Sequence, residues 1–182
     1  GGAMASVLNL YGVSDAKERM DRITAYVEQL EEQVQSQEEQ HKLLHEGTEE
    51  GNKVNRPYDD KNCILGATDI VLNRMMLSVS AKQILAGIGS GSLQERANKL
   101  DQSLRAMDGM VNMFYHNKGL NDGEGVPAKD QIPAQHLNIR YMRMFAGAFM
   151  YASGNHIGIE WGSVPGLAGA SPVQSEENGK YI

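Results

Sequence analysis

The sequence has a single cysteine, Cys63, among its 182 residues. One cysteine excludes an intrachain disulfide framework and favours a reducing compartment. The first residues, 1–6, also lack the basic and apolar segments of a secretory signal peptide and resemble the remainder of a cleaved tag. These absences favour the cytoplasm or a virion, although a secreted protein without disulfides would look the same, so the location stays open.

The sequence also lacks long apolar runs and catalytic motifs. Charged residues such as Asp69 and Lys82 interrupt the most apolar stretch, so no run of about 20 apolar residues is left to span a membrane. The glycine-rich stretches 87–91 and 119–125 lack the Lys-Ser or Lys-Thr pair of a phosphate-binding loop. We expect no membrane partner, no small-molecule substrate, no cofactor and no catalytic residue, and hence a protein that is not an enzyme.

A heptad stripe near the N-terminus is the strongest positive signal. Apolar residues recur there at alternating steps of three and four, at Met20, Ile23, Val27, Leu30 and Val34. A single helix cannot bury such a seam against itself, so the stripe predicts a coiled coil, most simply a parallel two-stranded one. Asp15 and Glu18 have the spacing of a capping box, which predicts that this helix begins at Asp15 and ends near Glu46. We assign self-association to the five seam residues.

Polar residues at the end of the stripe suggest a metal site as one alternative. Glu38, His41 and His45 lie at helical spacing on one face and could hold a divalent ion if two strands combined their side chains. The other interpretation is a polar end of the coil, and we favour it because glutamate is so frequent in this stretch. We therefore predict no metal site, with these three residues as the only candidates.

The remainder predicts an all-α protein with an extended tail. Apolar spacing, glycine stops and the capping box Ser92-Leu93-Gln94-Glu95 predict three further helices, over 62–86, 92–117 and 133–153. The predicted divisions are a leader (1–12), a coiled-coil helix (13–46), a linker (47–61), a helical domain (62–153) and an extended arm (154–182). In the arm, the alternation of Ile157, Ile159 and Trp161 predicts a short strand that pairs with a neighbouring subunit.

The charge changes sign along the chain, whose formal net charge is −6. Residues 61–153 carry 10 Lys or Arg against 7 Asp or Glu, whereas residues 1–60 are strongly acidic. A basic helical face of this kind could follow a phosphate backbone, and an ordinary solvated face is the alternative. The candidate nucleic-acid contacts are Arg74, Lys82, Arg96, Lys99, His136, Arg140 and Arg143.

These observations predict a self-associating structural protein. The seam, the apolar second helix and the tail strand would each need a neighbour, as in a viral or phage coat, a nucleoprotein or a secretion filament. The alternative is an oligomeric nucleic-acid-binding protein in which the coil sets the spacing of basic domains. The expected partners are therefore other copies of the chain and, in the alternative, nucleic acid.

Overall fold

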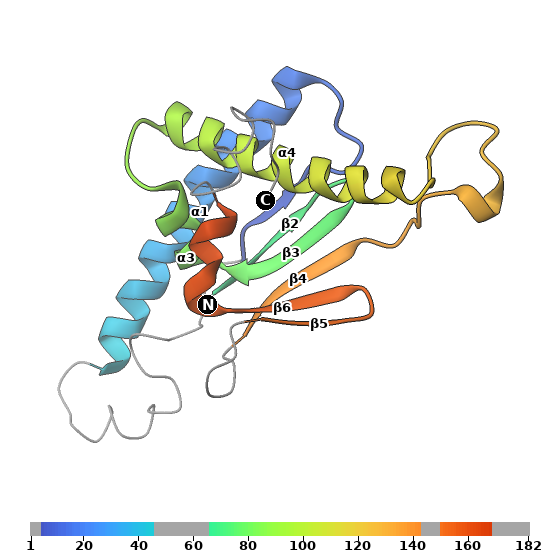
Figure 1. Ribbon diagram of the computed structural model, residues 1–182. Coiled ribbons are helices and arrows are strands. Elements are labelled where there is room, and N and C mark those ends of the chain that lie inside the picture. Colours follow the sequence, from blue (N-terminus) through green and yellow to red (C-terminus); the bar gives the residue numbers. More distant parts are fainter. Residues whose placement is uncertain (1–4, 46–65, 143–149, 169–182) are drawn as a thin grey trace.

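The computed structural model describes residues 5–45, 66–142 and 150–168, which contain both strands and helices (Figure 1). The strands are β1 (Val7–Asn9), β2 (Ala67–Val71), β3 (Met75–Ser80), β4 (Leu137–Met142), β5 (Met150–Ser153) and β6 (His156–Glu160). The helices are α1 (Ala16–His45), α3 (Ala81–Ile88), α4 (Leu93–Asn117) and the 3-10 helices η2 (Ala128–Asp130) and η3 (Trp161–Leu167). The prediction of an all-α fold is therefore wrong, because the protein is a mixed α/β structure.

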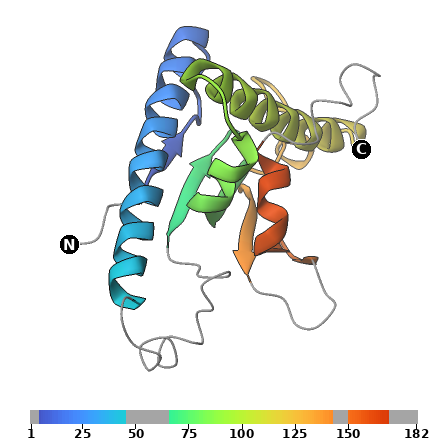
Figure 2. The same cartoon turned by 90° about the vertical axis from the view of Figure 1, so that its left-hand side faces the viewer.

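The six strands form one mixed sheet in the order β1-β2-β3-β4-β6-β5. β1 is parallel to β2, and β4 is parallel to both β3 and β6. The pairs β2/β3 and β5/β6 are antiparallel. β1 and β5 are thus the two edges. Helices α1, α3, α4 and η3 lie beside the sheet (Figures 1 and 2), and their buried side chains join one core with it.

Helix α1 agrees with the predicted bounds, and its apolar seam faces the chain's own core. The Asp15 carboxylate accepts a hydrogen bond from the Glu18 N–H at 2.7 Å, as the capping box predicted. Among the seam residues, Ile23, Val27 and Leu30 are completely buried, Val34 is nearly so, and Met20 packs against the same core. The prediction of a coiled coil is wrong because the sheet and α4 cover the seam; self-association through these residues stays a prediction.

Residues 67–88 correct the predicted helix over 62–86. In β2 and β3 the buried positions alternate with half-buried ones, as in strands whose two faces differ. The turn between them closes by a bond from the Leu72 N–H to the Met75 carbonyl at 2.8 Å. The Asp108 carboxylate of α4 accepts the N–H groups of Asn73 and Arg74 at 3.1 and 2.8 Å. Only α3 in this stretch is helical.

The predicted helix over 133–153 is also wrong, since this segment contains β4 and β5. Leu137, Ile139 and Tyr141 alternate along β4 and belong to the core or pack against it. The strand predicted at residues 157–161 is present as β6, but it pairs with β4 and β5 of the same chain. Trp161 begins η3, so the arm is structured as far as Ala168, and residues 169–182 lie outside the described part.

Helix α4 confirms the third predicted helix. Ser92 Oγ accepts the Glu95 N–H at 3.2 Å, and Glu95 Oε2 accepts the Ser92 N–H at 2.7 Å, which completes the capping box. These bonds to Ser92 hold the pKa of the Glu95 carboxyl below its ordinary value. Within the described ranges, no helix is long and apolar enough to cross a membrane.

Burial along one cross-strand row shows where the helical layer ends. The row crosses the sheet through Leu8, Ile70, Leu77, Ile139, Ile157 and Ala152. Its first four side chains are at most 7% exposed. Ile157 is half-buried and Ala152 on the edge strand is exposed. Along this row the layer therefore closes over β1 to β4 and leaves the β6 and β5 positions open. Farther along β6, Ile159 lies on the same face, is 8% exposed and belongs to the core.

Candidate functional site

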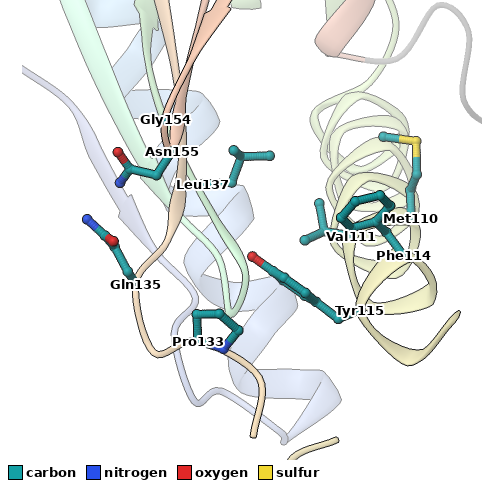
Figure 3. Close-up of a pocket in the computed structure, with 9 residues that line it drawn as sticks. All are labelled: Met110, Val111, Phe114, Tyr115, Pro133, Gln135, Leu137, Gly154 and Asn155. Carbon is teal, nitrogen blue, oxygen red and sulfur yellow. The ribbon is translucent and has the colours of Figure 1, made fainter. Parts of the chain in front are cut away.

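A groove of about 550 Å³ lies where this cover ends, between the second half of α4 and the beginning of β4 (Figure 3). It is lined by Met110, Val111, Phe114, Tyr115, Pro133, Gln135, Leu137, Gly154 and Asn155. α4 supplies one wall, and β4 with the β5–β6 turn supplies the other. Gly154 has a φ of +59°, a conformation that favours glycine and lets the turn close beside the groove.

The side chains of Tyr115, Gln135 and Asn155 bring hydrogen-bonding groups to this otherwise apolar groove. The Tyr115 hydroxyl points from α4 toward the wall formed by β4 (Figure 3). The Asn155 side chain donates to the His136 carbonyl at 3.4 Å, and its main-chain carbonyl accepts the Asn138 N–H at 2.8 Å. These bonds hold the β5–β6 turn against the start of β4. None of the nine lining residues is charged, so the groove suits an apolar surface that carries a few polar groups.

The candidate metal residues lie far along α1 from this groove. Glu38 forms an ion pair with Lys82 of α3, at 2.8 Å between Oε1 and Nζ. His41 and His45 lie in α1, but their side chains are outside the described part of the structure. The structure therefore connects Glu38 with a cation of its own chain, and the metal site of Glu38, His41 and His45 stays an untested alternative.

The candidate nucleic-acid residues are spread over several elements, and carboxylates of the same chain pair with three of them. Lys82 pairs with Glu38, and Arg96 pairs with Glu31 of α1. Arg74 donates to Asn112 at 2.5 Å and pairs with Asp122, and this bond holds the pKa of the Asp122 carboxyl below its ordinary value.

The remaining basic candidates also lie apart. Lys99 is exposed on α4, and Arg140 is exposed on the sheet face opposite the core row. His136 Nε2 lies 2.9 Å from the Leu72 carbonyl, with its ring edge-on to Tyr11. Arg143 lies outside the described residues. The structure does not gather the described candidates into one basic face.

No protein-family model and no curated protein matches this sequence. Solved structures do resemble the fold. The catalytic module of the metalloprotease ZmpA from Clostridium perfringens matches with a TM-score of 0.51 and 12% identity, over 92% of this chain and 26% of that chain. ZmpB metallopeptidase from the same organism matches with a TM-score of 0.50 and 18% identity, over 90% of this chain and 25% of that chain.

A third structure contains the M60 catalytic domain of ZmpB with two CBM51 domains, and it matches with a TM-score of 0.51 and 15% identity. The match extends over 91% of this chain and over 14% of the solved chain. This chain thus spans about a quarter, or less, of the solved chains that it resembles. Identities this low show likeness of fold alone, here to part of metalloprotease catalytic domains.

These likenesses correct the functional prediction. A structural assembly protein, or its nucleic-acid-binding alternative, was expected from the seam and the basic residues. The seam is covered within the chain, and the similar structures are catalytic domains. The prediction that the chain is not an enzyme is contradicted by the same findings.

The fold of these neighbours implies a metal, and the described residues do not fit one. In residues 5–45, 66–142 and 150–168, no group of three or more His, Cys, Asp or Glu side chains is placed to hold a metal ion. The sequence also contains no H-E-x-x-H motif, the zinc signature of many metallopeptidases. The nearest match, His45-Glu46-Gly47-Thr48-Glu49, has Glu49 in place of the second histidine. No metal-dependent step can be derived from these residues.

Sequence reasoning missed the groove because its residues were read as helix or core. Val111 and Phe114 were placed on the one narrow face by which α4 packs. The informative signal was that Met110 lies beside that face and widens it. A helix with more apolar surface than one neighbour can cover indicates a second packing partner.

Proposed function

We propose that this chain is the sheet-and-helix part of a peptidase catalytic domain of the metalloprotease type. The observation that carries the proposal is the fold likeness over 92% of this chain to a quarter of the ZmpA catalytic module. In this proposal the metal ligands come from residues outside those described here, because the described residues hold no suitable cluster.

The role of the described residues is then to build and position a substrate-binding layer. The sheet supplies a rigid floor, since the core row is buried from Leu8 to Ile139. The β5–β6 hairpin forms one edge of that floor and is fixed to β4 through Asn155 and Asn138. Sites on strands and helices hold catalytic geometry more precisely than sites on loops.

The test is proteolysis by the longer protein, meaning the natural product that contains this chain together with the rest of the domain. We expect it to cleave an unstructured protein such as casein, to lose that activity with a chelator and to regain it with Zn²⁺. A folded longer protein that cleaves no polypeptide in a broad substrate panel, with Zn²⁺ supplied, would contradict the proposal. Activity that the chelator does not affect would contradict the metalloprotease type.

A further inference from the structure

The α4 wall of the groove presents apolar side chains that are open to solvent. Met110 is 41% exposed and Phe114 is 55% exposed, while Val111 beside them is buried. The volume of about 550 Å³ lies within the range of pockets that hold small ligands. Such pockets are lined mainly by apolar side chains with a few polar groups, so this groove fits a ligand whose larger part is apolar.

A cation lies at one end of this wall. Met110, Phe114 and Lys118 follow one another at steps of four residues, so they form one row along α4 and its C-terminal cap, about 12 Å long. The Lys118 Nζ lies 4.4 Å from the centre of the Phe114 ring. Lys118 is exposed, and within the described residues it has no carboxylate partner. Asp122, the next acid along the chain, is paired with Arg74.

The position of this cation determines where a charged group of a ligand would lie. None of the nine lining residues is charged, so an ion between the walls would lose its hydration without gaining a partner. An anion at the end of the row keeps part of its hydration and meets the Lys118 ammonium. One ammonium matches the single charge of a carboxylate, whereas a phosphate monoester carries nearly two charges. The row therefore fits a molecule with an apolar body and one carboxylate at its end.

We propose that the groove binds an aliphatic monocarboxylate of medium length. Its chain would lie along the row from Met110 to Phe114, and its carboxylate would meet the Lys118 ammonium. The flexible thioether of Met110 suits such a chain, because methionine adapts its shape to what packs against it. This binding needs neither a metal nor proteolysis, so it can be present or absent whatever the outcome for the proposed function.

Two methionines of α4 serve as matched reporters of the bound chain. Met110 and Met113 are both 41% exposed, but only Met110 lines the groove. The experiment titrates octanoate into the 182-residue chain with isotope-labelled methionine methyl groups and follows their NMR signals. We expect the Met110 signal to shift and to saturate, and the Met113 signal to change little. A Met110 signal that does not saturate would overturn the proposal, and so would equal shifts of both signals, because octanoate would then coat the helix without a site.

The carboxylate is tested through the ligand and through the lysine. Octanol has the same chain without the charge, and we expect it to bind about two- to fivefold more weakly at low salt, the ratio expected for an exposed ion pair. Added salt should reduce this difference. Lys118→Glu should weaken octanoate binding about fivefold or more, because it replaces an attraction by a repulsion. Lys99→Glu is the control, since Lys99 is exposed near the other end of α4, and it should change binding by less than about twofold.

Three further outcomes would overturn the proposal. Equal affinity for octanoate and octanol, with no effect of Lys118→Glu, would show that the carboxylate is not recognised. An N-acetylated tripeptide that ends in leucine presents the same carboxylate on a peptide, and tighter binding of this peptide than of octanoate would assign the groove to a chain terminus. Light scattering that shows a self-associating chain, made monomeric by Met110→Glu, would assign it to a second copy.

Discussion

The two ends of the sheet share one face and differ in how it is covered. At the β1 to β3 end, the cross-strand row that begins at Leu8 is buried under α1 and α4. An ion pair between Arg19 and Asp101, at 2.6 Å, joins these two helices. At the β6 and β5 end the same row becomes exposed, and the groove opens beside α4. The difference shows that apolar pattern alone does not say whether a chain covers its own surface or leaves it for another segment.

The contrast has a direct consequence for function. A closed end gives a rigid platform, and an open end gives a surface that can receive another layer. The following substitutions would break or sharpen the contrast between the two ends.

Two isoleucines on the same row should give the largest difference. Ile70 is fully buried at the closed end, and Ile157 is half-buried at the open end. We expect Ile70→Ala to lower the free energy of unfolding by about 2–5 kcal/mol, and Ile157→Ala by about 1 kcal/mol, because less apolar surface is lost there. Urea unfolding of the 182-residue variants measures both, and equal losses would remove the distinction between the ends.

The next comparison concerns the charged contact at the closed end. The Asp101 carboxylate accepts from Arg19 at 2.6 Å and from Arg105 at 2.9 Å, and it is nearly buried. We expect Asp101→Ala to cost about 3 kcal/mol because the nearly buried Arg19 would lose its partner. Asp21→Ala is the control, since the Lys17–Asp21 pair is exposed and should contribute about 0.5 kcal/mol or less. A chemical denaturation curve in which both variants match the parent would refute the role of Asp101.

Two helix glycines give the smallest expected effects, with opposite signs. A Cβ on Gly87 of α3 would lie 2.5 Å from the Pro165 carbonyl and 2.6 Å from the Ala168 side chain, so Gly87→Ala should destabilise the α3–η3 contact by about 1–3 kcal/mol. A Cβ on Gly109 of α4 would meet nothing within 4 Å, so Gly109→Ala should stabilise the chain by about 0.5–1 kcal/mol. Thermal unfolding shows whether the two shifts differ in sign, and a shared sign would count against the close approach of α3 and η3.

The sequence predicted where helices begin better than it predicted the strands or which segments cover the sheet. The Asp15 and Ser92 caps are local signals, and both are present at the helix starts they predicted. β2 and β3 were missed because apolar residues on both strand faces read as a helix that is apolar all round. The seam of α1 was correctly read as a surface that needs a partner, but periodicity cannot say whether that partner is another chain or a sheet assembled from distant segments.

The candidate site was harder to foresee for the same reason. Its two walls come from α4 and from residues 133–155, and no local pattern connects them. Three of the seven basic candidates are paired with carboxylates of the same chain, those of Glu31, Glu38 and Asp122. Those pairings depend on how α1, α3 and α4 pack, which charge spacing along the chain does not reveal.

Hydrogen–deuterium exchange of β3 and β6 tests the central claim most directly, that the helices close one end of the sheet more completely than the other. In the 182-residue chain, the amides of β3 should exchange at least about tenfold more slowly than those of β6, because exchange follows local opening. Equal protection of β3 and β6 in the 182-residue chain would contradict the account.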